Sequence, residues 1–318
     1  MKKILIIGAS GQIGTDLTLE LRSRLGSDQI VASDIRPGTY EVMEGGPFEE
    51  LDALDKERLK DILDEYAITE IYHLAAVLSG KAENNPKWAW DLNMGSLFNV
   101  LNVAREKGIS RIFWPSSMGA FGPTTPKWDT PQVTVMEPTS VYGISKLAGE
   151  RWVEYYHNHY GMDIRSLRYP GLISYTAKAG GGTTDYAVDI FYHAMEYGHY
   201  ECFLSEDIIL PMMYMEDAVN ATIKLMEAPC DSIKVRSSYN LGGISFSQGE
   251  LVAEIRKYIP ELEVSYNPDF HQEIAESWPN RISDRAARND WGWKHEYDLP
   301  RMTRVMVEKI REKVAKET

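Results

Sequence analysis

The sequence predicts an α/β protein with a doubly wound, Rossmann-type parallel sheet and a smaller C-terminal lobe. Short apolar runs rich in β-branched residues alternate with segments of helical periodicity along the first half of the chain, as in parallel sheets. The first of these runs leads directly into a glycine-rich turn and a helix. The alternation loosens in the second half, which indicates a lobe built beside the sheet.

Composition excludes several classes of function. The 318 residues are 43% hydrophobic and 25% charged, which is typical of a globular protein with a sizeable core. The net charge of −13 argues against nucleic acids and acidic membranes as partners, because both are polyanions. Cys202 and Cys230 are too few for a disulfide framework or a cysteine-rich zinc site, so we expect no metal and a cytoplasmic location. The apolar run at residues 4–7 is too short for a signal peptide, and no stretch approaches the ~20 apolar residues of a membrane span.

The first predicted strand, residues 3–7, is followed at once by a GxxGxxG turn and a helix that begins near residue 15. Glycines in this position allow a tight turn and the close approach of a pyrophosphate to the helix N-terminus. A glycine triplet alone is a weak signal, but here the strand before it and the helix after it agree. The residues that we expect to hold the pyrophosphate are Gly8, Gly11, Gln12, Ile13 and Gly14.

Asp34 ends the second predicted strand, residues 29–34, twenty positions after Gly14. A carboxylate at this point accepts hydrogen bonds from the adenosine ribose and repels a 2′-phosphate, which favours NAD over NADP. Arg36, two residues later, favours NADP instead, because a cation there could pair with a 2′-phosphate. We therefore expect residues 1–175 to form an NAD-binding Rossmann domain, to which some later segments return, and residues 176–318 to form mainly a substrate-binding lobe.

Further cofactor contacts are expected along the carboxyl ends of the later strands, where ligands bind in open α/β sheets. A third strand ends near Leu51-Asp52, where Asp52 either reaches the adenine or simply begins an acidic, solvated helix. A fourth strand lies within residues 70–80 and has its tip at Ala75-Ala76; His73 inside it reads as a core histidine without a catalytic role, and Ser79 lies just past its carboxyl end. The other residues expected to line the cofactor are Leu74, Ala75, Ala76, Asn93 in the first turn of a helix over 91–107, and Tyr169 at the end of a sixth strand.

Tyr142 and Lys146 lie four residues apart at the start of a predicted helix, and so share one helix face. An ammonium near a phenol lowers the phenol pKa, which makes the tyrosine a usable general base. The YxxxK pattern alone is common on helix surfaces. It gains weight from Ser116 and Ser117, two hydroxyl donors at the carboxyl end of the fifth strand, which shortly precedes the helix.

Two loops are expected near this site. Residues 121–138 are rich in proline and threonine and form a plausible cover. Gly180 to Gly182 precede two threonines, and this segment reads either as a flexible element that closes over a ligand or as a simple linker.

The GASGQIG turn, Asp34, HLAA, the serine pair and YGISK, in this order, resemble the extended short-chain dehydrogenase/reductase superfamily over essentially the whole chain. Longer strings resemble the short-chain type of L-threonine 3-dehydrogenase more specifically. These strings are PSSMGAFGPTTPK, RYPGLIS, GGGTTDYAVDIFY, and SWP followed by DWGW. The resemblance implies an NAD-dependent oxidoreductase of threonine catabolism that converts the 3-hydroxyl of L-threonine into the ketone of 2-amino-3-oxobutyrate.

The resemblance also assigns roles. Tyr142 matches the catalytic base, Lys146 the residue that lowers its pKa and binds the nicotinamide ribose, and Ser117 the catalytic hydroxyl, with Ser116 as a possible helper. The positions that the resemblance assigns to the amino-acid pocket are Ser79, Ser117, Tyr142, Thr184 (or the adjacent Thr183) and Trp278.

The alternative within the superfamily is a nucleotide-sugar epimerase or dehydratase. Such enzymes usually continue the sixth strand to an asparagine that contacts the diphosphate, whereas this chain has Pro170-Gly171 there. Relatives pair as homodimers through helices that correspond to residues 93–107 and 145–158. Trp152, Val153 and Tyr156 suit such an interface, but a buried face within one subunit explains them equally well.

Overall fold

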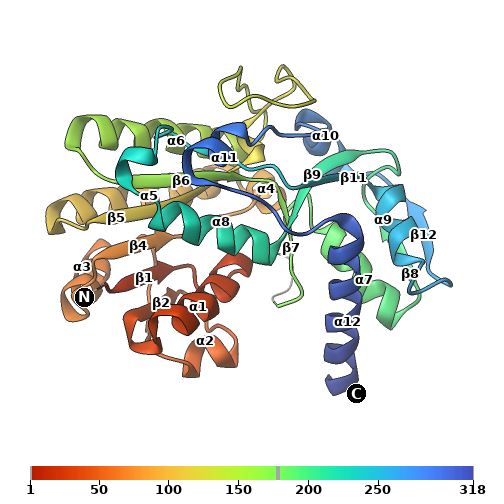
Figure 1. Ribbon diagram of the computed structural model, residues 1–318, viewed down its shortest axis with the longest axis horizontal. Coiled ribbons are helices and arrows are strands. Elements are labelled where there is room, and N and C mark those ends of the chain that lie inside the picture. Colours follow the sequence, from red (N-terminus) through yellow and green to blue (C-terminus); the bar gives the residue numbers. More distant parts are fainter. Residues whose placement is uncertain (1, 177–179, 318) are drawn as a thin grey trace.

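The computed structural model describes residues 2–176 and 180–317 and confirms the predicted Rossmann-type fold. Figure 1 shows the main sheet with helices on both faces, and a second lobe beside it that contains α7, α9, α10 and α12. Within the described residues, no helix combines the length and apolarity that a membrane span requires.

The main sheet has seven strands in the order β10-β6-β5-β4-β1-β2-β3, and every neighbouring pair is parallel. The strand order reverses at β1, which lies between β2 and β4, so a ligand crevice is expected at the carboxyl ends of these strands. The strands are β1 (Ile4–Ile7), β2 (Ile30–Asp34), β3 (Phe48–Glu50), β4 (Glu70–His73), β5 (Arg111–Ser117), β6 (Ile164–Tyr169) and β10 (Tyr239–Asn240).

Alternate residues of each strand enter different cores, as the pleat requires. Ile4 and Ile6 pack towards α1 and α8, whereas Leu5 and Ile7 pack towards α3, α5 and α6. Strands β1, β2, β4, β5 and β6 are therefore buried on both faces, whereas the edge strand β3 is partly exposed. The helices of this lobe are α1 (Gln12–Leu25), α2 (Tyr40–Glu44), α3 (Lys56–Glu65), α4 (Ser79–Asn84), α5 (Pro86–Lys107), α6 (Val141–Tyr160), α8 (Met215–Glu227) and α11 (Arg285–Trp291).

The second lobe contains a three-stranded sheet in the order β11-β9-β7 and a parallel pair of strands, β8 and β12, which share one apolar core with the lobe's helices. Its strands are β7 (Gly171–Ile173), β8 (His199–Cys202), β9 (Ile209–Tyr214), β11 (Ile244–Ser247) and β12 (Glu263–Tyr266). Its helices are α7 (Tyr186–Glu196), α9 (Gln248–Ile255), α10 (Phe270–Ser277) and α12 (Leu299–Glu317). Strand β10 lies in the main sheet although elements of the second lobe precede and follow it in sequence; the division at residue 175 remains a prediction.

Four predicted elements have wrong boundaries. The fourth strand ends at His73, because the amides of Leu74 and Ala75 both donate to the carbonyl of Ile7 and the chain then leaves the sheet. The long helix begins at Pro86, where Asn85 caps it by accepting from the amide of Trp88, so Asn93 lies beyond its first turn.

The predicted sixth strand is divided in two. Pro170 carries no amide hydrogen and separates β6, in the main sheet, from β7, in the second lobe. The third strand likewise ends at Glu50, before Leu51-Asp52.

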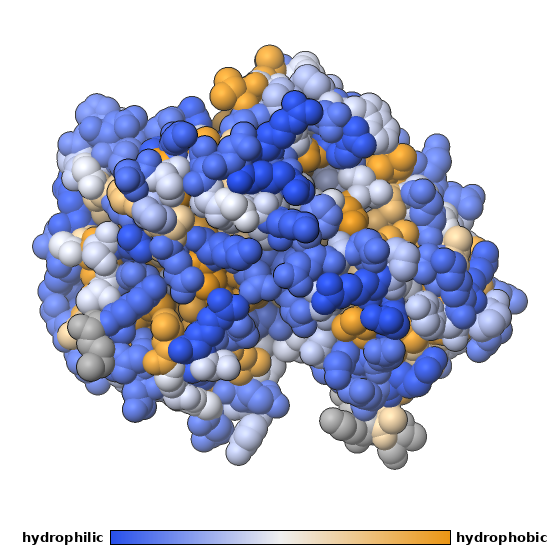
Figure 2. Space-filling view, viewed as in Figure 1, coloured by the Kyte–Doolittle hydropathy of each residue, from blue (hydrophilic) through white to orange (hydrophobic). Residues whose placement is uncertain are grey.

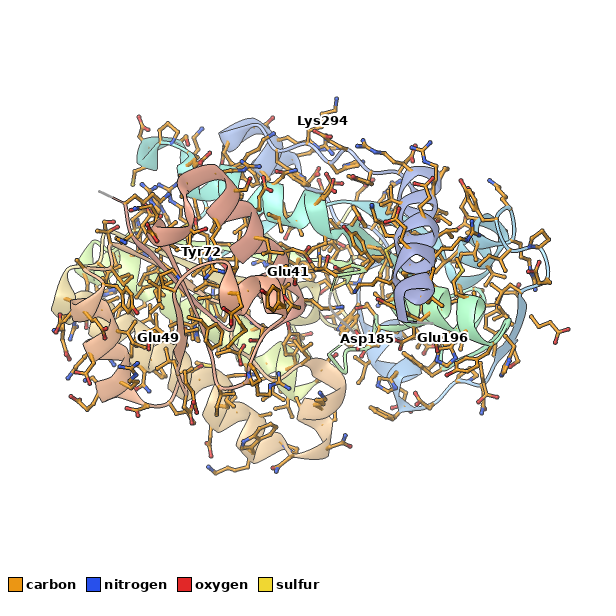
Figure 3. All side chains as sticks on the ribbon, turned by 90° about the horizontal axis from the view of Figure 1, so that it is seen from below. Glu41, Glu49, Tyr72, Asp185, Glu196 and Lys294 are labelled. Carbon is orange, nitrogen blue, oxygen red and sulfur yellow. The ribbon has the colours of Figure 1, made fainter. Side chains whose placement is uncertain are left out.

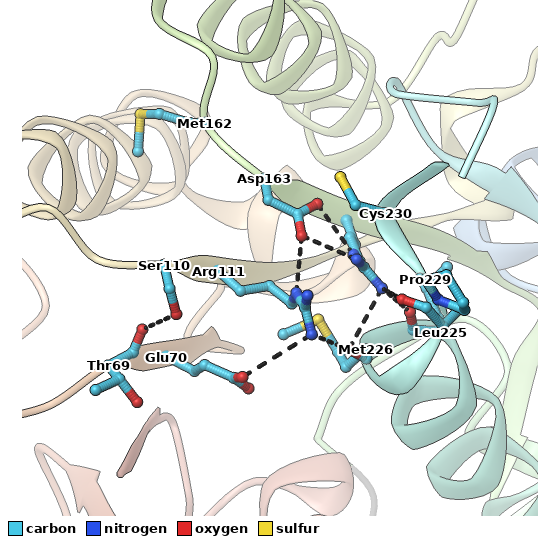
Figure 4. A network of polar contacts seen from close by, with 12 residues as sticks. Thr69, Glu70, Ser110, Arg111, Met162, Asp163, Leu225, Met226, Pro229 and Cys230 are labelled. Atoms are coloured by element: carbon cyan, nitrogen blue, oxygen red, sulfur yellow. Dashed lines mark hydrogen bonds and ion pairs between the residues drawn. The ribbon is translucent and has the colours of Figure 1, made fainter. Parts of the chain in front are cut away.

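The amino ends of β5 and β6 are joined by an ionic network around Asp163 (Figure 4). Its carboxylate accepts hydrogen bonds from Arg111, Arg165 and Arg236, at 2.8 to 3.0 Å. Burial opposes ionisation, but the bonds from Arg165 and Arg111 prevail and lower the pKa of Asp163 to about 2. The network lies at the opposite edge of the sheet from the expected ligand crevice, so we assign it to stability.

The visible face in Figure 2 is largely hydrophilic, with a hydrophobic group at the top over the loop between β5 and α6. This loop, residues 121–138, is free of helix and strand, as predicted. Its exposed apolar side chains include Trp128 and Val133.

Candidate active site

Two of the three motif glycines are required by the fold itself. Gly8 has a φ of +93°, and a Cβ atom there would lie 2.7 Å from the amide nitrogen of Ala75. At Gly14, a Cβ atom would lie 2.1 Å from the carbonyl oxygen of Gly8. These two glycines let α1 start close against the end of β1.

Gly11 differs, because neither its backbone nor its surroundings demand a glycine. Its φ is −79°, and the nearest atom to an added Cβ would be the carbonyl oxygen of Gly8, at an ordinary 3.4 Å. No side chain caps this end of α1 among the described residues, so the amides of its first turn are left for a ligand. The buried Nε2 of Gln12 also has no partner within the described chain. The unobstructed backbone at Gly11, the uncapped amides of the first turn of α1 and the unpaired Nε2 of Gln12 are donors and space that fit the pyrophosphate of a dinucleotide.

Asp34 lies beside this turn at the end of β2. Its carboxylate accepts from the amides of Ser10 and Arg36, at 3.0 and 3.2 Å, and is thereby held at the carboxyl edge of the sheet. Asp52 is exposed and accepts from the amide of Leu54 at 2.9 Å. That bond supports the turn before α3, and an adenine contact of Asp52 remains a prediction.

Asn93 holds the loop that follows β4. Its side chain exchanges hydrogen bonds with both the amide and the carbonyl of Val77, at 2.8 and 3.2 Å, and donates to the hydroxyl of Ser145 at 3.3 Å. The partly buried residues Leu74 to Ala76 precede Val77 directly, and Leu74 and Ala75 lie against Gly8 of the glycine turn. Asn93 therefore connects the cofactor-side loop to α6, one residue before Lys146.

We expect Gly11→Ala to weaken NAD binding at least about tenfold without lowering thermal stability. The reason is that the new methyl makes only an ordinary contact with the Gly8 carbonyl but occupies the approach of the pyrophosphate, and alanine suits a helix end at negative φ. NAD titration by tryptophan fluorescence and a melting curve measure the two effects. The matched control, Gly14→Ala, should lower the melting temperature, because its methyl collides with the backbone. Unchanged NAD affinity in Gly11→Ala would contradict this placement of the cofactor.

The structure brings Ser117 and Tyr142 together from different elements. Ser117 ends β5, where its hydroxyl accepts from the amide of Gly119 at 3.1 Å. Tyr142 is in the first turn of α6, which Ser140 caps by accepting from Gly143 at 3.1 Å. The Tyr142 ring and the Ser117 hydroxyl both lie against Gly119, and the interaction of the phenol with Ser117 acts to lower the pKa of Tyr142. A substrate hydroxyl placed against this pair meets both polar groups.

Lys146 is buried one turn further along α6. Its ammonium lies 5.5 Å from the centre of the Tyr142 ring and 4.7 Å from the Trp114 ring, and donates to the carbonyl of Pro115 at 2.6 Å. Burial lowers the pKa of Lys146 to about 7, although the charge of Glu150 opposes that shift.

The pKa of Tyr142 differs from the prediction. Burial raises it to about 12, and the interaction with Ser117 only partly opposes this. The expected lowering of this pKa by Lys146 is wrong, because desolvation of the buried phenolate is the dominant effect and the ammonium of Lys146 donates to the carbonyl of Pro115.

Ser116 does not face the reacting centre. Its hydroxyl donates to Glu150 at 2.6 Å, and Glu150 forms a bidentate ion pair with Arg168 at 2.8 and 2.7 Å. Both charged side chains are buried. Glu150 lies one turn after Lys146 on α6, and this spacing was the only sequence signal for the network, which the sequence interpretation missed.

Two other side chains belong to the core. His73 is fully buried, its Nε2 lies 3.1 Å from the hydroxyl of Ser96, and burial lowers its pKa to about 3, so it is neutral as a core histidine should be. Tyr169 sits opposite Ser117 in the sheet register, but its hydroxyl is bound to Thr222 of α8. Its side chain is therefore occupied, and a cofactor contact from it remains a prediction.

The predicted substrate residues partly converge. Ser79, the first residue of α4, bonds both the hydroxyl and the amide of Thr183 at 3.2 Å, and this contact joins the two lobes. Thr184 packs against Gly171 at the start of β7. Trp278 is buried in the same cluster as Met118 and Phe121, which follow Ser117 closely.

Asp185 is a further residue that the sequence interpretation missed, and it lies near the centre of the view in Figure 3. Its carboxylate accepts from the amides of Gly181 and Gly182, both at 2.7 Å, and so shapes the glycine segment around Thr183. Burial raises the pKa of Asp185, against these amide bonds. Burial and the charge of Asp185 together raise the pKa of Asp189 to about 6.

A glycine turn that fits a dinucleotide lies beside β1, where the strand order reverses, and Ser117, Tyr142 and Lys146 lie at the carboxyl ends of the strands. Together these features define a nicotinamide-dependent enzyme of the short-chain dehydrogenase/reductase type. The chain belongs to the NAD dependent epimerase/dehydratase family, whose profile matches residues 4–242. This membership confirms NAD as the predicted cofactor.

The similarity to known proteins extends over nearly the whole chain. An uncharacterized epimerase/dehydratase of Staphylococcus saprophyticus is 48% identical, over 98% of this chain and 97% of the relative. Among solved structures, a partial consensus L-threonine 3-dehydrogenase is 53% identical, with a TM-score of 0.95 over 98% of this chain and 99% of that one. The holo form of a GalE-like L-threonine dehydrogenase from Cupriavidus necator is 52% identical, with a TM-score of 0.94 over 97% and 99%.

Proposed function

We propose that this protein is an NAD-dependent L-threonine 3-dehydrogenase that oxidises the 3-hydroxyl of L-threonine and forms 2-amino-3-oxobutyrate. The observation that carries the proposal is that Ser117, at the end of β5, and Tyr142, in the first turn of α6, both lie against Gly119 at the carboxyl ends of the strands. The identity of 52–53% to L-threonine dehydrogenases over the full chain supports this substrate.

In this proposal the substrate hydroxyl lies between the side chains of Ser117 and Tyr142. Ser117 orients the hydroxyl and Tyr142, once ionised, takes its proton. When bound, NAD⁺ supplies the acceptor for the hydride that leaves C3 of the substrate. Lys146 lies close enough to Tyr142 to favour the phenolate whenever it is protonated.

The amino-acid pocket is proposed to use hydroxyls and backbone amides rather than a dedicated ion pair. Ser79, Thr183 and Thr184 contribute hydroxyl groups, and the buried face of Trp278 closes the apolar side. Serine and 2-amino-3-hydroxypentanoate differ from threonine by one carbon, which is worth only ~1–3 kcal/mol of discrimination. Some oxidation of both is therefore expected.

The test is the initial rate of NADH formation with NAD and a panel of hydroxy amino acids. We expect L-threonine to be preferred, with weaker turnover of its near homologues. The site disfavours the epimerase alternative, because Pro170-Gly171 replaces the expected asparagine and Gly171 begins a strand of the second lobe. Interconversion of nucleotide sugars without net NADH, together with no oxidation of threonine, would overturn the proposal.

We also propose that two copies pair through α5 and α6. Of the three candidate contacts, Val153 and Tyr156 are buried within their own subunit, whereas Trp152 is 38% exposed and lies next to Tyr155, which is 40% exposed. We expect Trp152→Glu to convert a homodimer into a monomer, because it places a charge in an apolar contact. Size-exclusion chromatography with light scattering measures this, with Trp128→Glu, on a loop elsewhere, as the control. A wild-type monomer would contradict the proposal.

We propose a cytoplasmic location as well. Cys202 and Cys230 are both free thiols, which suits a reducing compartment.

A further inference from the structure

A carboxylate on the cofactor-binding helix holds the chain that leads to the proposed substrate segment. Asp16 lies on α1 one turn after Gln12. Its two oxygens accept from the hydroxyls of Thr176 and Ser174, at 2.8 and 3.1 Å. The hydroxyl of Ser174 also accepts from the amide of Thr176 at 3.1 Å, which closes a tight turn directly after β7.

The same short segment, residues 174–176, is bound from the second lobe. Lys313 of α12 donates to the carbonyls of Tyr175 and Thr176, at 2.6 and 3.0 Å. Tyr192 of α7 donates to the carbonyl of Tyr175 at 3.0 Å. Segment 174–176 is therefore held between α1 of the first lobe and two helices of the second.

The carboxylate of Asp16 is partly buried. Burial raises its pKa, while the hydrogen bonds from Thr176 and Ser174 oppose the shift. Ser174 is only 1% exposed. A partly buried carboxylate that accepts two hydrogen bonds has a defined geometry, unlike the exposed carboxylate of Glu20, the other acidic residue of α1.

We propose that Asp16 is a positioning residue, which sets the substrate-binding segment against the helix that binds the cofactor. The first turn of α1 faces the cofactor cradle, and Asp16 on the next turn fixes residues 174 and 176. Thr183 follows a few residues later in sequence, and its amide donates to the hydroxyl of Ser79. The reacting carbon and the nicotinamide come from these two sides, so their alignment depends on this connection. The inference rests on the proposed dehydrogenase function.

Asp16→Ala tests this role in the full-length enzyme. We expect the KM for L-threonine to increase about tenfold, the size typical of a lost coupling between elements. The Kd for NAD and the melting temperature should change little, because the cradle amides and the helix remain. Asp16→Asn retains one acceptor oxygen for Thr176 and should show a smaller increase in KM.

Two controls distinguish positioning from general stability. Glu20→Ala removes an exposed carboxylate on the same helix, which pairs with Arg24, and should leave the KM unchanged. The double variant Ser174→Ala, Thr176→Val should raise the KM as Asp16→Ala does, and combining all three changes should add no further effect.

If the wild-type enzyme oxidises threonine and Asp16→Ala keeps a normal KM, the inference is wrong and the proposed function stands. If Asp16→Ala raises the KM for threonine but also weakens NAD binding and lowers the melting temperature, Asp16 has a general structural role and the inference is again wrong. If the wild-type enzyme itself oxidises no threonine, the proposed function fails first.

Discussion

Tyr142→Phe is expected to lower kcat for threonine oxidation at least ~10²-fold, the usual size of general-base catalysis. The substitution removes the phenolic oxygen, while the ring keeps its place against Gly119 and Ser117 keeps its bond to the Gly119 amide. NAD binding should be retained, because the cradle at α1 is untouched. Steady-state kinetics and an NAD titration measure the two quantities.

The pH profile sharpens this prediction. Burial raises the pKa of Tyr142 to about 12 in the ligand-free protein, so its phenolate fraction grows as the pH rises towards that value. The wild-type rate should therefore increase with pH, and the small remaining rate of Tyr142→Phe should not follow the same curve. Tyr155→Phe, on the exposed face of the same helix, is the matched control and should be fully active. Near-normal turnover by Tyr142→Phe would remove Tyr142 from the catalytic role.

Glu150→Ala is expected to destabilise the protein by about 3–5 kcal/mol, the usual cost of removing one partner from a buried ion pair. The variant leaves the guanidinium of Arg168 buried, with only neutral acceptors from Gln132 and Asn240. It also removes the acceptor of Ser116. Urea denaturation compares the midpoints of wild type and variant, provided that the slope of the transition is unchanged.

The double variant Glu150→Leu, Arg168→Met provides the control. It removes both charges, so it should be more stable than Glu150→Ala alone. Glu154→Ala, one turn further along α6 and paired only at the surface with Arg151, should change stability by less than about 1 kcal/mol. A loss of that small size in Glu150→Ala would show that the buried pair does not stabilise the fold.

The fold was predictable because its signals are local. The alternation of β-branched runs and helical periods defines a parallel sheet without knowledge of any contact between distant residues. The backbone of the glycine turn determines its own conformation, as the φ of Gly8 and the close approach of Gly14 demonstrate. Strand boundaries were less predictable. The apolar residues after His73 continue the sequence pattern of a strand, and only the bonds of Leu74 and Ala75 to Ile7 end it.

The site was predictable in its residue types but not in its partners. The i, i+4 spacing places Tyr142 and Lys146 on one helix face regardless of the rest of the chain. Ser116 and Ser117 are adjacent and chemically identical, and the pleat of β5 sends one to Glu150 and the other to Tyr142. No local pattern distinguishes the two.

By itself, the sequence determined the Rossmann-type sheet, the dinucleotide turn and the helix face that carries Tyr142 and Lys146, because each depends on backbone preference or short spacing. The tertiary structure decided which serine meets the tyrosine, that burial outweighs Lys146 in setting the pKa of Tyr142, and that Asp16 reaches Ser174 and Thr176. These features depend on desolvation and on contacts between distant segments, and both exist only once the chain is packed.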